Sequence, residues 1–139
     1  MIITERPPNF EQILAAFPNA DKPGVIFAYG EHIYNPSGII IPPPLREHEL
    51  VHCERQLNLY TSGSPEYWWK QYIDDAEFRY REELLAHVAE YRAQAPKDRN
   101  LRSKLLMVTA ARLCAPLYNY QPPRSLSVAM RDLKWELDR

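Results

Sequence analysis

Cysteine, net charge and long apolar runs are all scarce in this sequence of 139 residues. Two cysteines, Cys53 and Cys114, are too few for a disulfide framework, which indicates a reducing compartment. Seventeen basic and eighteen acidic residues leave a formal net charge of -1, which excludes the strong field that draws a protein to nucleic acid or an anionic membrane. No window approaches the roughly 20 apolar residues of a membrane span, and the N-terminal residues lack the basic and apolar regions of a signal peptide. We therefore expect a soluble, cytoplasmic protein with no nucleic-acid or membrane partner.

Proline is plentiful but unevenly placed. The 13 prolines crowd the first 44 residues and residues 116–123, whereas residues 66–95 contain none. A hydrophobic content of 45% is enough for one domain with a single core. Because proline interrupts helices and marks turns, the middle of the chain is expected to be helical. The sequence therefore predicts a single domain, residues 1–139, of the α+β class and mostly helical.

Hydrophobic periodicity and turn residues predict the individual elements. A small antiparallel sheet is expected near the N-terminus, with strands at residues 24–30, 32–34 and 39–41, the last two joined by the turn Asn35-Pro36-Ser37-Gly38. Helices are expected at residues 9–16, 45–59, 66–73, 75–95, 98–114 and 125–137. Ser64 is the expected N-cap of the third of these helices, and Asp74 or Asp75 that of the fourth.

Two histidines lie four residues apart in the expected helix 45–59. In the segment His48-Glu49-Leu50-Val51-His52 the i, i+4 spacing places both imidazoles on one face, where they can bind one metal ion. Glu49 then lies beside the metal rather than on it, which is the position of a general base. A catalytic zinc ion has three protein ligands and an open position. A third ligand must therefore come from elsewhere in the chain.

The glutamates of the expected helix 75–95 are the candidates for that third ligand. The residues after His52 lack the glycine turn and the later histidine of a metzincin, which excludes that class. Glu83 is favoured because Ala86 allows two helices to approach closely and because Glu83 shares a helical face with His87. Glu90 and Glu82 remain alternatives.

Other residues near the motif carry weaker predictions. A hydrolytic site needs a further donor for the oxyanion, and the sequence does not choose among the candidates, which are His87, Tyr91, Tyr60 and an arginine. Cys53 points about 100° away from His52 on the helix and is expected to be a buried apolar residue. Trp68 and Trp69 are expected to pack between the metal-binding helices. Arg112 is expected to be an ordinary surface charge.

Three stretches of the chain together resemble a known family. They are His48-Glu-Leu-Val-His-Cys-Glu-Arg-Gln56, Tyr67-Trp-Trp-Lys-Gln-Tyr72, and Phe78-Arg with Glu83-Leu-Leu-Ala-His-Val-Ala-Glu-Tyr91. This combination, within residues 26–93, resembles the small zinc-metallopeptidase-like proteins of tailed bacteriophages and prophages, which belong to the minimal gluzincins. One difference is Leu85, where relatives often carry an acidic residue.

The resemblance implies a minimal zincin-like fold in which His48, His52 and Glu83 bind Zn²⁺ and Glu49 is the catalytic base. It also implies that the strand before the motif lies at the edge of the cleft, where an extended substrate can add to the sheet. A phage-encoded protein of this kind would act in the host cytoplasm.

The sequence therefore predicts zinc-dependent hydrolysis of a peptide or amide bond in a peptide or protein substrate. The alternative is a non-catalytic, phage-type structural or binding protein that retains a structural zinc site. Neither the cleavage specificity nor the oligomeric state follows from the sequence.

Overall fold

Six α-helices and a small sheet make up the protein. A computed structural model describes all residues, 1–139. The strands are β1 (Ile2–Ile3), β2 (Phe27–Tyr29) and β3 (His32–Tyr34), and the 3₁₀ helices are η1 (Pro18–Asp21) and η2 (Pro116–Tyr118). The α-helices are α1 (Phe10–Ala16), α2 (Pro43–Leu57), α3 (Pro65–Asp74), α4 (Ala76–Gln94), α5 (Arg99–Leu113) and α6 (Leu126–Leu137). The predicted mostly helical α+β fold, with the histidine helix after the sheet, is confirmed. No helix combines the length and the apolar composition that crossing a membrane requires.

Capping residues set the boundaries of the helices that carry the motif and its partners. The Ser64 hydroxyl accepts a hydrogen bond from the Tyr67 amide at 3.1 Å, and the Asp75 carboxylate accepts two from the first turn of α4. Each cap pairs an amide that a helix N-terminus otherwise leaves free. Helix α2 begins at Pro43 rather than at the predicted residue 45, because prolines in the first turn forfeit no helical hydrogen bond. It ends before Asn58, whose carbonyl accepts from three amides of the following loop.

The sheet is mixed rather than antiparallel, and the predicted strand 39–41 is wrong. The open side of β3 is taken by β1, which pairs with it in parallel. The Ile33 amide donates to the Met1 carbonyl at 2.9 Å and the Asn35 amide to the Ile3 carbonyl at 2.8 Å. The Asn35 side chain closes the following turn by donating to the carbonyl of residue 39. Residues 39–41 therefore run into the prolines of α2 without a strand to pair with.

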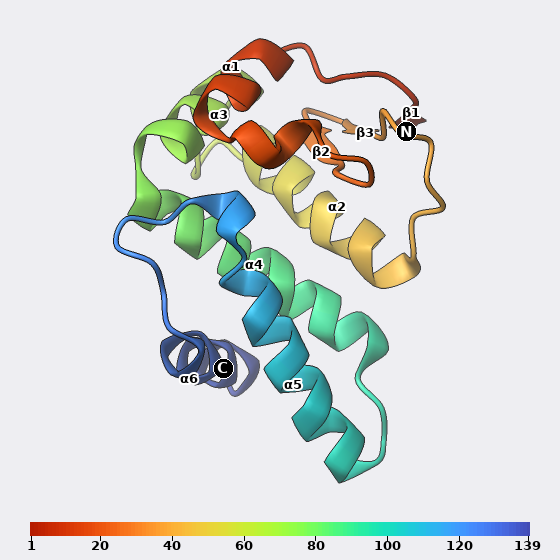
Figure 1. Ribbon diagram of the computed structural model, residues 1–139, viewed down its shortest axis with the longest axis vertical. Helices are drawn as coiled ribbons and strands as arrows, with labels where there is room; N and C mark the ends of the chain where they lie inside the picture. The colour runs from red at the N-terminus through yellow and green to blue at the C-terminus, as the bar shows by residue number, and fades with distance from the viewer.

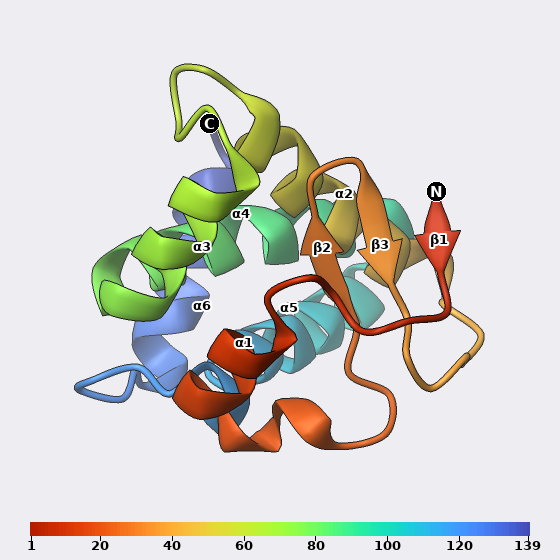
Figure 2. The same cartoon turned by 90° about the horizontal axis from the view of Figure 1, so that it is seen from above.

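Strands β2 and β3 form a hairpin that leads directly into the site. Tyr29 pairs with His32 across a two-residue turn, and Gly30 begins this turn with φ 62°, a conformation that glycine adopts without steric cost. β2 starts at Phe27, later than predicted, because Gly24 has φ 89° and breaks the extended backbone. The strand order β1-β3-β2 leaves β2 at the edge of the sheet, as Figure 2 shows.

Two separate apolar clusters flank the pair of helices α2 and α4, which pack against each other (Figure 1). The first joins α1, η1, β2 and α3, and its buried members are Phe10, Ile13, Phe17, Ala20, Phe27, Trp68, Trp69, Tyr72 and Phe78. The second joins α4, α5 and α6 through Tyr80, Leu84 and Val88, which share one face of α4. The predicted packing role of Trp68 and Trp69 is confirmed.

The interface between α2 and α4 is polar, although it is buried. Its side chains are His48, Glu49, His52 and Gln56 of α2 and Glu82, Glu83, His87 and Glu90 of α4, and each residue is at most 6% exposed. Burying charged groups costs free energy unless they are paired or bind a metal ion. Apolar packing does not explain why these charged and polar residues lie at the centre of the fold, so a functional role is the more economical explanation.

Candidate metal centre

The two histidines of the motif face one carboxylate of α4. His48 Nε2 lies 3.3 Å from Glu83 Oε1, and His52 Nε2 lies 3.0 Å from Glu83 Oε2. Tetrahedral zinc bonds of about 2.0–2.1 Å place neighbouring donor atoms about 3.3 Å apart. Each histidine nitrogen thus lies at about the distance from a Glu83 oxygen that two ligands of one zinc ion have, and imidazole nitrogens and carboxylate oxygens are donors that zinc accepts.

Glu83 is held in this position from its far side. The hydroxyl of Tyr72, on α3, donates to Glu83 Oε2 at 2.7 Å, whereas Glu83 Oε1 is buried without a hydrogen-bond partner. Burial disfavours the charged carboxylate, but the adjacent His52 and His48 hold the pKa of Glu83 well below its usual range. A permanently ionised carboxylate with one unpartnered oxygen is suited to bind a cation.

Glu90 lies on the other side of His48 and completes a chain of contacts. Its Oε1 is 3.4 Å from His48 Nδ1, and its Oε2 accepts a hydrogen bond from Arg112 at 2.7 Å. A carboxylate behind a metal-binding histidine fixes the ring orientation and the tautomer. Glu90 is therefore placed to orient His48 rather than to share a metal ion with His52.

His87 is the fourth side chain close to this centre. Ligand atoms of His48, Glu83 and His87 lie within 4.8 Å of one another, so this buried group could hold a metal ion. His87 Nδ1, however, lies 2.7 Å from the backbone carbonyl of Glu83. A carbonyl only accepts, so Nδ1 carries the proton and Nε2 keeps the lone pair. Burial and the charge of His48 lower the pKa of His87 to about 4, which keeps the ring neutral.

Glu82, an alternative ligand in the sequence, points away from the histidines. The N–H of Arg55 Nε is shared between its two carboxylate oxygens, each at 2.8 Å, and the Trp68 indole donates to it at 2.7 Å. These two donors tie α4 to α2 and α3. Glu82 is therefore a structural residue. The local sequence alone did not separate its role from that of Glu83.

Glu49 lies beside the histidines and faces open space. Its Oε1 is 3.9 Å from His48 Nε2, and the residue lines the same cavity as His48, His52 and Glu83. Burial raises the pKa of Glu49, and so do the charges of Glu83 and Glu90, while the two histidines lower it. A raised pKa makes this carboxylate a stronger base than an exposed glutamate.

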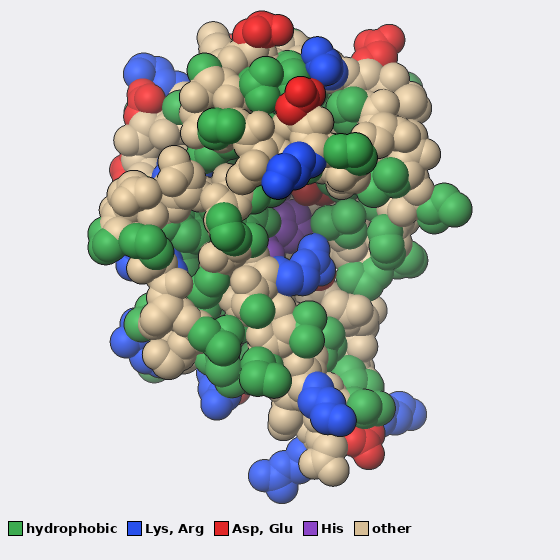
Figure 3. Space-filling view, in the orientation of Figure 1, with side chains coloured by type: hydrophobic (Ala, Val, Ile, Leu, Met, Phe, Trp, Pro, Cys, Tyr) green, Lys and Arg blue, Asp and Glu red, His purple; other side chains and the backbone are tan.

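A cavity of about 220 Å³ opens over these residues. Figure 3 shows the hollow on the face of the molecule, with histidine visible inside it and basic side chains beside its opening.

Arg112 and Tyr118 both line the cavity. Arg112 is an exposed residue, as predicted, but the fold also pairs it with the buried Glu90. Tyr118 was not predicted from the sequence, because its only local signal is its position two residues after Pro116. Tyr60 is fully exposed and lies outside the cavity, so it cannot serve as an oxyanion donor.

Strand β2 borders the cavity. Phe27 and Ala28 line the cavity wall, but the carbonyl of Ala28 is already occupied. It accepts hydrogen bonds from Gln56 Nε2 at 2.9 Å and from the Trp69 indole at 3.0 Å. Cys53 packs against the other face of this hairpin, in a cluster with Ala28 and Ile33, and is a buried apolar residue as predicted.

Comparison of the chain with protein-family models, with curated proteins and with solved structures gave no match.

Proposed function

We propose that the protein is a zinc-dependent hydrolase of peptide or amide bonds, in which His48, His52 and Glu83 bind Zn²⁺. The observation that carries this proposal is the buried, charged α2–α4 interface, whose donor atoms converge beside a cavity. Several of these buried atoms, including Glu83 Oε1, have no hydrogen-bond partner. A metal ion would satisfy them, in addition to the contacts that the histidines make with Glu83 and Glu90.

The residues around the centre have separate roles in the proposed reaction. When bound, zinc supplies Lewis-acid chemistry, which polarises a carbonyl group and makes water acidic near neutral pH. Glu49 accepts a proton from the attacking water as the new carbon–oxygen bond forms. It then donates this proton to the leaving nitrogen as the carbon–nitrogen bond breaks. Glu90 holds the ring of His48, and Tyr72 holds the carboxylate of Glu83.

Tyr118 and Arg112 are the donors that we assign to the developing oxyanion, because both line the cavity. Burial and the charge of Glu83 raise the pKa of Tyr118 well above its usual value, so its hydroxyl keeps its proton. His87, a predicted donor, is disfavoured because its one N–H faces the Glu83 carbonyl. The occupied carbonyl of Ala28 also removes one acceptor that an added substrate strand would use along β2.

A structural zinc site without turnover is the second candidate, and the position of His87 favours it. A fourth protein ligand would close the site, as in structural zinc centres, whereas a catalytic centre keeps one position open. His87 lies near enough to His48 and Glu83 to be considered. Its Nε2, which carries the lone pair, is buried without a hydrogen-bond partner.

Metal removal tests the proposed function directly. We expect one equivalent of zinc per chain in metal analysis, and cleavage of a peptide library by the zinc-loaded protein, monitored by mass spectrometry. Chelation should abolish cleavage, and added zinc should restore it, because no other group here can activate water to the same degree. One zinc ion per chain without any cleavage would instead support the structural site.

Zinc binding should release close to one proton per chain at pH 7. Burial lowers the pKa of His48, but the carboxylates of Glu83 and Glu90 outweigh this and raise it to about 10 in the metal-free protein. His48 is therefore protonated at pH 7 without metal, and zinc must displace that proton. A histidine of ordinary pKa, about 6.5, would be only about one quarter protonated at pH 7.

Isothermal titration calorimetry in buffers of different ionisation enthalpy measures this release. It should stay near one proton between pH 7 and pH 9 and fall only as the pH rises through about 10. The same protonation stabilises the metal-free fold, fully below pH about 6.5 and progressively less toward pH 10. A release near one quarter of a proton at pH 7 would contradict the raised pKa.

A further inference from the structure

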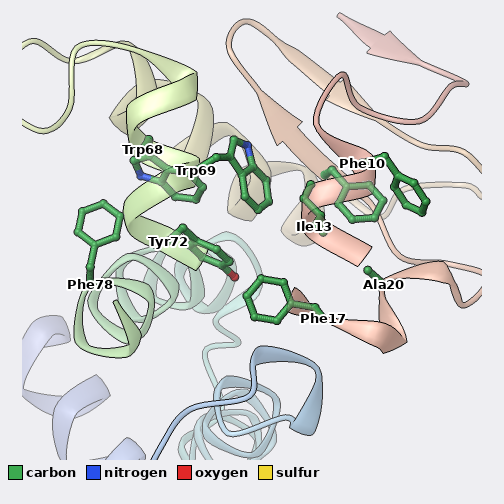
Figure 4. Packing of buried hydrophobic residues seen from close by; sticks show 9 residues of the cluster. Phe10, Ile13, Phe17, Ala20, Trp68, Trp69, Tyr72 and Phe78 are labelled. Atoms are coloured by element: carbon green, nitrogen blue, oxygen red, sulfur yellow. The ribbon is translucent and has the colours of Figure 1, made fainter. Parts of the chain in front are cut away.

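The cavity beside the metal centre has one wall without charge. This apolar wall consists of Ile13, Phe17, Ala20, Val25, Phe27 and Trp69. Figure 4 shows Ile13, Phe17 and Ala20 of the α1–η1 segment facing Trp69 and Tyr72 of α3. All charged residues that line the cavity belong to α2, α4 and α5. The cavity thus has a charged side and an apolar side, built from different parts of the chain.

The apolar wall also offers no free side-chain hydrogen-bonding group. Its only polar side-chain atom, the indole nitrogen of Trp69, donates to the Ala28 carbonyl at 3.0 Å. The neighbouring Tyr72 hydroxyl is committed to Glu83. A charged or amide side chain placed here would lose its hydration without finding a partner, which is costly.

The cavity is large enough for a bulky side chain. Its volume is about 220 Å³, and an apolar cavity of about 150 Å³ already binds benzene. The wall also begins next to the metal centre. The ring centroids of His52 and Tyr72 are 6.4 Å apart, and those of Tyr72 and Phe17 are 5.9 Å apart. One aromatic ring, that of Tyr72, therefore separates His52 from the wall residue Phe17.

We infer that the cavity selects substrates with a large apolar residue, of leucine or phenylalanine size, next to the bond that is cleaved. The apolar wall binds this side chain while the backbone lies over His48, His52 and Glu49. As a statement about substrate choice this inference rests on the proposed function, but binding of the side chain does not depend on catalysis. The two can therefore be tested separately.

The binding test uses N-acetyl-leucinamide and N-acetyl-asparaginamide, which are similar in size and differ in polarity. Each is titrated into the protein while the methyl signals of Ile13 and Ala20 are followed by NMR. We expect the leucine compound to shift these signals saturably and to bind at least about tenfold more tightly than the asparagine compound. Equal affinities, or no shift of the wall methyls, would overturn the inference.

Two substitutions change the size of the cavity in opposite directions. Ala20→Leu fills it and should weaken binding of the leucine compound at least about tenfold, whereas Ala15→Leu, at an exposed position of α1, should have no effect. Leu117→Ala, at another lining residue, enlarges the cavity and should shift the preference from N-acetyl-leucinamide to N-acetyl-phenylalaninamide. Because Leu117 is only half-buried, this variant keeps the test open if Ala20→Leu fails to fold. If the affinities changed neither with the smaller nor with the larger cavity, the cavity would not be the binding site of the apolar side chain.

Cleavage of a peptide library separates this inference from the proposed function. Large apolar residues should be enriched beside the cleaved bond, and Ala20→Leu should shift the enrichment toward alanine and glycine. Cleavage without apolar enrichment would refute the inference and leave the hydrolase proposal intact. Saturable binding of the leucine compound without any cleavage would support the binding site and refute the hydrolase.

Discussion

Glu49→Gln is expected to reduce hydrolysis by about 10²–10⁴-fold while leaving zinc binding unchanged. Glutamine has the same shape as glutamate but no carboxylate to accept a proton from water. Glu49 points into the cavity and is not needed as a ligand. The raised pKa of Glu49, caused first by burial, shows that its charge is unfavourable for folding. The variant should therefore be as stable as the wild type or more so, as is common at catalytic positions.

The measurements are initial rates on the cleaved library peptides, zinc content, and thermal unfolding of the same preparations. Glu47→Gln, at an exposed position of the same helix, is the matched control and should behave as the wild type. Loss of zinc in Glu49→Gln would make Glu49 a ligand, and an unchanged rate would place the general base elsewhere. Either result contradicts the proposed role.

The neighbouring glutamates 82 and 83 should respond to the same substitution in opposite ways. Glu83→Gln is expected to weaken zinc binding by at least about a hundredfold. This exceeds the usual loss of metal affinity when a residue that only hydrogen-bonds to a ligand is replaced. Glu82→Gln should leave zinc affinity unchanged but cost about 2–3 kcal/mol of folding stability, because Arg55 and Trp68 lose a charged acceptor. Competition with a chelator gives the first quantity, and urea denaturation of the metal-free protein gives the second.

Glu90→Gln tests whether Glu90, rather than Glu83, is the third zinc ligand. Glu90 contacts His48 from behind and is paired with Arg112, so its loss should weaken zinc binding only about 10–100-fold. If Glu90→Gln abolished zinc binding while Glu83→Gln retained it, the third ligand would be Glu90. Arg112→Met is the companion variant, because it leaves Glu90 in place without its cation.

Local sequence signals predicted most of the helices, because each depends on residues close together in the chain. Ser64 and Asp75 cap the helices that they were expected to cap. The sheet was predicted less well. Residues 39–41 are as apolar as a strand, but the partner position beside β3 is filled by β1, which comes from the other end of the N-terminal segment. Pairing between distant segments leaves no local signal.

The sequence by itself determined that His48 and His52 share a helix face with Glu49 between them, because helical spacing fixes that relation within five residues. It also limited the third ligand to a few glutamates of one helix. Only the tertiary structure separated these glutamates, since neighbours on α4 point about 100° apart and their partners come from α2, α3 and α5. The same holds for Arg112, Tyr118 and the apolar wall, which lie near the histidines only because the chain folds back on itself.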